Sequence, residues 1–223
     1  MNTNKHQEFF APQLVTENIH IIGCGAIGST LAMYIAKMGI ENIILYDEDI
    51  VEDKNVANQM YCDDDIGKPK TEALKEYLIR INPLLERTIK TKPFYKNEKL
   101  DGYVFMAVDS IKVRRKIVES NKFNLKVKAM FDFRMRLEDA QHYAADWSSV
   151  EMKDELLATM DFTEEEAAEQ TPRSACNEVL SFFPTITAIA GEGIWNFVHF
   201  VKDRKSIKKM ILYSSQCHYF DAF

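Results

Sequence analysis

A glycine-rich turn between a short apolar run and an amphipathic helix constrains this chain more than any other feature. The apolar run covers residues 18–22, the turn GCGAIG covers residues 23–28, and the helix is predicted to stop at Gly39. In such a turn the first glycine permits the sharp bend, the second lets backbone approach a phosphate, and the third lets helix and strand pack closely. The helix N-terminus then favours an anion. The predicted binding residues are Gly23, Gly25, Ala26, Ile27 and Gly28.

An acidic residue follows the next apolar run. Residues 42–47 read NIILYD, which indicates a second buried strand, parallel to the first. Asp47 ends this run at about the distance from the turn at which a carboxylate binds the ribose hydroxyls of a nucleotide. Strand, turn, helix, strand and acid together predict a nucleotide site. They do not distinguish NAD or FAD from ATP, so that choice depends on later residues.

The rest of the chain continues to alternate between strands and helices. Helices are expected over residues 70–83, 111–119 and 183–205, and strands over residues 87–93, 103–108, 126–133 and 136–146, with a last strand in 208–223. The pattern predicts an α/β fold with a Rossmann-like core. The 223 residues are expected to form a single domain, in which the acidic stretch 147–175 is a mobile crossover outside the core.

Charge and composition narrow the possible partners. A net charge of −6 argues against a broad grip on nucleic acid or on an anionic membrane surface. No apolar stretch is long enough for a membrane span and no signal peptide is indicated, so a cytoplasmic location is expected. A structural zinc site is not expected, because the cysteines form no CxxC pair, and a disulfide is not expected in a reducing cytosol. They are Cys24, Cys62, Cys176 and Cys217, the last beside His218.

The loop after residue 47 contains three short motifs in a fixed order. They are D-x-D-x-V at Asp47, Asp49 and Val51, then N-V-A-N-Q at residues 55–59, then D-I-G-x-x-K at Asp65 to Lys70. A later strand ends at Asp109, and Arg114 follows five residues on. Over residues 18–120 the chain resembles the ThiF/MoeB/HesA family and the ubiquitin-activating E1 enzymes. Beyond them it resembles short stand-alone ThiF-type proteins of phages and mobile elements.

This resemblance implies both a fold and a reaction. The fold would be a doubly wound, mostly parallel sheet with antiparallel C-terminal strands. The reaction would use ATP and Mg²⁺ to activate a carboxylate as an acyl-adenylate, typically at the C-terminus of a ubiquitin-like protein, a sulfur-carrier protein or a peptide. The family resemblance also suggests a homodimer.

The same resemblance assigns roles to individual residues. Asp47 would bind the ribose, Lys70 would face the phosphates, and Asp109 would be the magnesium ligand. Asn55 and Gln59 would be neutral donors to the nucleotide, and Asp49 belongs to the same motif. The expected catalytic residues are Lys70, Asp109, Arg114 and Cys176.

Two residues depart from the family pattern within the nucleotide motifs. Ala26 stands where the family commonly has the second of two adjacent glycines. Asn58 stands where the N-R-Q motif has an arginine, so the guanidinium that would donate paired hydrogen bonds to the phosphates is missing. Arg114, Arg115 or an arginine from a second subunit could compensate. The lack of paired CxxC motifs is typical of the shorter branch of the family.

Each assignment has a structural alternative. Lys70 and Asp65 could be solvated residues at a helix start, and Asp109 could be a helix N-cap. Arg114 and Arg115, with Lys112 and Lys116, are expected to form a solvated helix face rather than a nucleic-acid site.

Cys176 could accept the acyl group as a thioester, with Arg173 lowering its pKa, but a buried structural cysteine is the interpretation favoured here. The competing functions are an NAD(P)- or FAD-dependent oxidoreductase and a non-catalytic module of the same fold.

Overall fold

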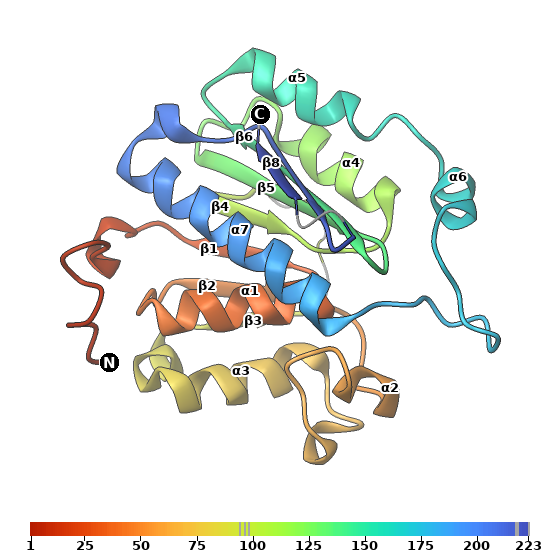
Figure 1. Cartoon of the computed structure of the whole chain (residues 1–223). Coiled ribbons are helices and arrows are strands. Elements are labelled where there is room, and N and C mark those ends of the chain that lie inside the picture. Colours follow the sequence, from red (N-terminus) through yellow and green to blue (C-terminus); the bar gives the residue numbers. More distant parts are fainter. Residues whose placement is uncertain (94, 96, 98, 217–218, 223) are drawn as a thin grey trace.

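An eight-stranded sheet forms the centre of the computed structural model (Figure 1). The structure describes residues 1–93, 95, 97, 99–216 and 219–222. Across the sheet the strand order is β3-β2-β1-β4-β5-β6-β7-β8. The strands are β1 (Ile19–Ile22), β2 (Ile43–Tyr46), β3 (Lys90–Lys92), β4 (Gly102–Met106), β5 (Val127–Met135), β6 (Asp139–Asp146), β7 (Met210–Ser214) and β8 (Tyr219–Ala222). The helices are α1 (Ala26–Lys37), α2 (Asp53–Val56), α3 (Lys70–Ile81), α4 (Ile111–Asn121), α5 (Val150–Ala158), α6 (Glu164–Glu169) and α7 (Phe183–Lys202).

The sheet is parallel in its first half and antiparallel in its second. Strands β3, β2, β1, β4 and β5 pair in parallel, whereas β6, β7 and β8 pair antiparallel. The predicted mostly parallel sheet with antiparallel C-terminal strands is confirmed. The tail contributes two strands instead of the single strand expected, and Cys217 and His218 between them lie outside the described residues.

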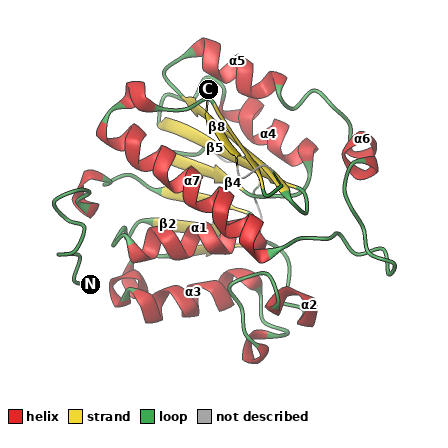
Figure 2. Ribbon diagram, viewed as in Figure 1, coloured by secondary structure: helices red, strands yellow, loops and turns green. Residues whose placement is uncertain are grey.

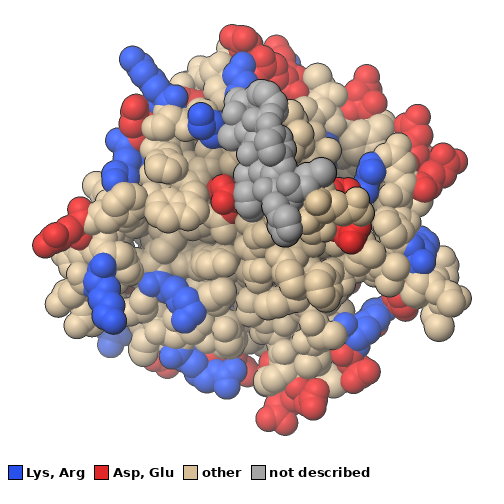
Figure 3. All heavy atoms as spheres, viewed as in Figure 1, with Lys and Arg blue, Asp and Glu red and all other residues tan. Residues whose placement is uncertain are grey.

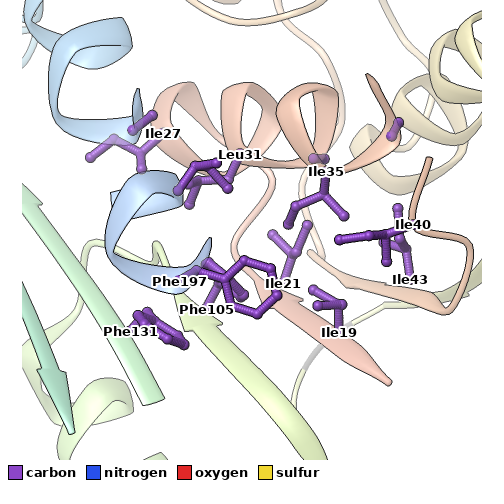
Figure 4. Close-up of a cluster of buried hydrophobic side chains, with 14 of the residues drawn as sticks. Ile19, Ile21, Ile27, Leu31, Ile35, Ile40, Ile43, Phe105, Phe131 and Phe197 are labelled. Atoms are coloured by element: carbon purple, nitrogen blue, oxygen red, sulfur yellow. The ribbon is translucent and has the colours of Figure 1, made fainter. Parts of the chain in front are cut away.

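The helices cover both faces of the sheet (Figure 2). Helices α1, α3 and α7 pack on one face, where Ile21, Leu31, Phe105, Phe131 and Phe197 belong to one buried cluster (Figure 4). Helices α4 and α5 pack on the other face around a second cluster. Strands β1 and β2 are therefore buried on both sides, which explains why their sequences are unbroken apolar runs.

Helices α1 and α7 begin and end where the sequence predicts, within a few residues. After α1 the chain turns at Gly39, whose φ of +85° is the left-handed conformation expected of a residue following a helix. Helix α7 is a core helix, as expected, with buried residues at helical spacing. No helix among the described residues has both the length and the apolar character needed to cross a membrane.

The acidic stretch after β6 departs from its expected place outside the core. Trp147, Leu156 and Met160 are buried in the second cluster, and α5 packs against β6 and α4. The expectation was wrong for this first half because the acidic residues occupy only the outer side of α5. By contrast α6 buries no residue, and it extends from the body of the molecule (Figure 1).

A buried histidine on β6 predicts how stability depends on pH. The Nδ1 atom of His142 lies 3.1 Å from the Asp132 carbonyl oxygen, which can only accept, so Nδ1 carries the proton. Its Nε2 then accepts from Asn196 Nδ2 at 3.0 Å, and the ring is neutral. Burial lowers the pKa of His142 to about 4 from its ordinary value of 6.5.

Between pH 6.5 and about 4 the unfolded chain therefore binds a proton at His142 that the folded chain excludes. This group lowers the free energy of unfolding by about 1.4 kcal/mol for each pH unit of acidification within that window. Urea unfolding of wild type and His142→Gln at several pH values measures the difference in slope. The same substitution at His199, on the exposed side of α7, should keep the wild-type slope. Parallel slopes for wild type and His142→Gln would contradict the prediction.

Candidate functional site

Three loops begin side by side at one edge of the sheet. In the parallel register the last residue of β1, Ile22, pairs with Tyr46 at the end of β2 and with Met106 at the end of β4. The loops that follow these residues therefore start at the same level. Because β2 and β4 lie on opposite sides of β1, this edge is a switch point of the strand order, where α/β sheets bind ligands.

The glycine turn has the geometry that the sequence predicts. Gly23 has a φ of +94°, and a Cβ on it would lie 2.7 Å from the carbonyl carbon of Ala107. A Cβ on Gly28 would lie 1.8 Å from the Gly23 carbonyl oxygen, so helix and turn approach too closely for a side chain. A Cβ on Gly25 would meet nothing within 4 Å. No side chain caps the 12-residue helix α1, so its first N–H groups can bind an anion in the open space beside Gly25.

The carboxylate of Asp47 connects the loop after β2 to the glycine turn by hydrogen bonds. Its Oδ2 accepts from the Cys24 N–H at 2.6 Å, and its Oδ1 accepts from the Asp49 N–H at 2.9 Å. Burial raises the pKa of Asp47, while these two N–H groups and the charge of Lys70 act in the opposite direction. Each carboxylate oxygen keeps a second lone pair, which can accept from a ribose hydroxyl.

Lys70 lies at the first position of α3 and belongs to the same group of charges. Its side chain is 9% exposed, and its Nζ lies 2.8 Å from Asp49 Oδ2. Tyr61, which the sequence did not indicate, donates to the Cys24 carbonyl oxygen at 2.7 Å and lies 3.3 Å from the Lys70 carbonyl oxygen. The alternative that Lys70 and Asp65 are solvated is wrong, since both are buried.

The loop at residues 55–59 supplies amide groups. Asn55 is buried, and its Oδ1 accepts from the Glu52 N–H at 2.9 Å. Among the described residues its Nδ2 donates to no protein group. Asn58 donates through Nδ2 to Ser181 Oγ. Asn58 Oδ1 and Gln59 Oε1 are buried, and no described residue donates a hydrogen bond to either atom.

Asp109 follows β4 and is exposed. It is not the N-cap of α4, because Ser110 takes that place with Oγ accepting from the Val113 N–H at 3.3 Å. Within the described part of the chain, the Asp109 carboxylate makes no hydrogen bond or ion pair, and no cluster of three potential metal-binding side chains occurs. The residues present fit Mg²⁺, since that ion takes one or two carboxylates and completes its shell with phosphate oxygens and water.

Arg114 is buried and holds the end of β4. Its guanidinium donates to the carbonyl oxygens of Met106 and Val108 and pairs with Asp132, which also pairs with Arg134. The expected solvated face is therefore wrong for this residue. Arg115 also has protein partners, because it donates to the Met160 carbonyl oxygen at 2.9 Å.

Residues 164–181, called the crossover segment below, are attached at both ends to the edge that bears these loops. At one end Glu164 Oε1 accepts from Ser110 Oγ at 2.6 Å and from the Lys112 N–H at 3.1 Å. At the other end Ser181 contacts Asn58, and Glu178 lies 3.4 Å from Lys54 Nζ. Figure 1 shows the segment passing from α4 to the neighbourhood of α2.

Cys176 lies within a tight turn of the crossover segment. Asn177 N–H donates to the Ser174 carbonyl oxygen at 2.9 Å, and Arg173 pairs with Val179. The favoured interpretation of Cys176 as a buried residue is wrong, because its side chain is exposed. Arg173 donates to the Asn177 carbonyl oxygen at 2.7 Å.

The fold and this edge together define a doubly wound α/β protein, with an uncapped helix and a carboxylate at the switch point of its sheet. The chain belongs to the ThiF family, whose sequence pattern matches residues 7–208. A 72-residue stretch, 32% of this chain, is 32% identical to the SAMP-activating enzyme E1 of Haloferax volcanii and covers 27% of that protein.

Two solved structures have the same fold as this chain. PaaA superimposes with a TM-score of 0.73 at 15% identity, over 99% of this chain and 68% of PaaA. Escherichia coli MccB with ATP superimposes with a TM-score of 0.71 at 19% identity, over 95% of this chain and 64% of MccB. These superpositions confirm the predicted fold, and the match over residues 7–208 confirms the predicted family.

Proposed function

We propose that this protein is an ATP-dependent adenylyltransferase that activates the C-terminal carboxylate of a ubiquitin-like protein, a sulfur-carrier protein or a peptide. The observation that carries the proposal is that Asp47 and Asp109 follow neighbouring strands at the edge where uncapped α1 begins, with Lys70 in contact with Asp49 beside Asp47, in a chain of the ThiF family. The E. coli relative named sulfur carrier protein ThiS adenylyltransferase is 31% identical over 77 residues, which are 31% of its length.

In the proposed reaction a carboxylate oxygen attacks the α-phosphorus of ATP, and the bond to the pyrophosphate leaving group breaks. The α1 N-terminus and Lys70 stabilise the negative charge that collects on the phosphates. Lys70 exchanges part of its contact with exposed Asp49 for phosphate oxygens. Asp47 accepts from the ribose hydroxyls, and Asn55 Nδ2 donates to the nucleotide. No general base is required, because a carboxylate is already ionised at neutral pH.

Magnesium, held by Asp109, would neutralise charge on the departing pyrophosphate. Arg114 acts as a positioning residue, since its bonds to Met106 and Val108 set the end of β4 just before Asp109.

ATP–pyrophosphate exchange tests the proposal. The protein is incubated with ATP, Mg²⁺, labelled pyrophosphate and a panel of C-terminal tail peptides, and label is expected to enter ATP with at least one of them. The same peptides as C-terminal amides lack the nucleophilic carboxylate and should give no exchange. Tight binding of NAD with no binding of ATP would overturn the proposal in favour of an oxidoreductase.

Cys176 is proposed to capture the activated acyl group. Its thiolate would attack the carbonyl carbon of the acyl-adenylate, and AMP would leave as a thioester forms. Wild-type protein with ATP and an active peptide should gain the mass of the peptide less one water, and dithiothreitol should remove it. Cys176→Ala should retain exchange and lose the adduct, whereas Cys62→Ala, at the other cysteine that is exposed among the described residues, should keep both. An adduct that persists in Cys176→Ala would end this assignment.

The remaining partners belong to the same proposal. The reaction would take place in the cytoplasm without nucleic acid or a membrane, and the chain would act as one domain. A homodimer would bury the face over α1 and α7, which carries few charges at its centre (Figure 3). Trp195 of α7 is 51% exposed and Phe9 is 48% exposed, and the centroids of their rings lie 5.7 Å apart.

A further inference from the structure

We propose that Asn58 and Gln59 form an acceptor pair that binds N–H groups of the acyl substrate, so that the site selects a peptide-like acyl group over other carboxylates. This inference rests on the proposed function, and it assigns a specificity role to the position where the chain departs from the N-R-Q motif.

The two amide oxygens receive no hydrogen bond from the part of the chain that the structure describes. Among the described residues, three buried side-chain nitrogen or oxygen atoms lack a hydrogen-bond partner, and two of these are Asn58 Oδ1 and Gln59 Oε1. Burying an acceptor without a donor is unfavourable, so such groups are normally paired. Two consecutive unpaired acceptors in a nucleotide motif indicate donors that a ligand supplies.

The surrounding contacts locate the pair between the nucleotide turn and the crossover segment. Asn58 Nδ2 donates to Ser181 Oγ at the end of that segment. Just after Gln59, the Met60 N–H donates to Ser29 Oγ on α1 at 3.1 Å. The loop that carries the pair therefore lies beside the first turns of α1, and Asn58 contacts the end of the crossover segment.

The chemistry of the reactants identifies which of them brings donors to this place. The triphosphate and the reacting carboxylate carry only acceptors at neutral pH. Donors remain on the ribose hydroxyls, which Asp47 is proposed to bind, on the exocyclic amine of adenine, and on the peptide bonds and amide side chains of an acyl chain. The crossover segment carries Cys176, whose thiol must reach the acyl carbon under the proposed function, so the acyl chain is the reactant expected at its end.

The residue types agree with this role. An arginine at position 58 would offer five donors and no acceptor, which suits phosphate. Asparagine offers a short side chain that can donate to Ser181 and accept from a ligand at the same time. The substitution thus exchanges a phosphate contact for an acceptor facing the substrate.

The test compares the most active tail peptide from the exchange assay with its ester analogue, in which oxygen replaces the last peptide N–H. For wild type the ester should raise the KM in ATP–pyrophosphate exchange about tenfold, the size expected for a lost hydrogen bond to a buried acceptor. At least one of Gln59→Met and Asn58→Leu, the one that removes the acceptor of this N–H, should bring the two KM values within about twofold. Asn58→Asp keeps an acceptor at this position and should therefore still discriminate between the peptide and its ester, as wild type does. Gln13→Met, an exposed amide ahead of β1, is the matched control and should behave as wild type.

The outcomes separate the inference from the proposed function. Unchanged discrimination in both Gln59→Met and Asn58→Leu would overturn the inference alone. Purine riboside triphosphate lacks the exocyclic amine. The ratio of its KM to the KM of ATP should be the same in wild type and in Gln59→Met. If only wild type discriminates against it, the pair binds adenine and the inference is wrong. A wild-type protein that exchanges with no peptide overturns the proposed function and the inference together.

Discussion

Replacing Gly28 by alanine is expected to abolish nucleotide binding and to lower the free energy of unfolding by about 3 kcal/mol, the upper range for overpacking a tight site. The new Cβ would lie 1.8 Å from the Gly23 carbonyl oxygen and 2.9 Å from its carbonyl carbon. Backbone atoms cannot move aside like the end of a flexible side chain. Helix α1 must therefore shift away from the turn, and it takes the phosphate-binding N–H groups with it. Urea unfolding and ATP calorimetry measure the two effects.

Gly25→Ala is the matched variant, because it changes the same turn without this clash. Its φ of −71° suits alanine, and the new Cβ would meet nothing within 4 Å. Stability should stay within about 1 kcal/mol of wild type. ATP affinity should fall at least tenfold, since the Cβ enters the space that a phosphate occupies on close approach to backbone. Unchanged affinity in Gly25→Ala would show that the phosphates bind elsewhere.

The fold was largely predictable because its signals are local. Apolar runs fully buried on both faces mark β1 and β2, and Gly39 marks the end of α1. The acidic composition of α5 predicts a segment outside the core, although one narrow side of the helix, at Leu156, is buried. Only contact with β6 and α4, which no local pattern encodes, reveals that side.

The site was predictable where one motif spans it and obscure where distant segments meet. Asp47 and Lys70 lie in a single run of motifs. Glu164 reaches Ser110 across 54 residues, and Ser181 reaches Asn58 across 123 residues, so neither contact leaves a pattern in the sequence. The sequence predicts a solvated Arg114 because its partner, Asp132, lies on the following strand, where no local pattern reveals the ion pair.

Asp109→Ala is expected to reduce ATP–pyrophosphate exchange about a thousandfold or more, the scale of removing a group that stabilises transition-state charge. The carboxylate is exposed and makes no hydrogen bond or ion pair within the described part of the chain, so its loss should cost no more than about 0.5 kcal/mol of stability. A large loss of activity with an unchanged unfolding curve would then show that Asp109 acts in the reaction and does not merely stabilise the fold. Raising the magnesium concentration should recover little, because the ligand itself is missing.

Asp109→Asn decides between a magnesium ligand and a structural polar residue. Asparagine keeps the size and one oxygen of the side chain but removes the charge, so a metal ligand should fail in both variants, whereas a residue that only packs or caps would tolerate asparagine. Asp139→Ala, an exposed carboxylate on β6, is the control for losing one surface charge and should exchange like wild type. Near-normal exchange in Asp109→Asn would remove magnesium from this position. The adenylation proposal would then need another carboxylate, and exposed Asp49, already in contact with Lys70, would be the first to test.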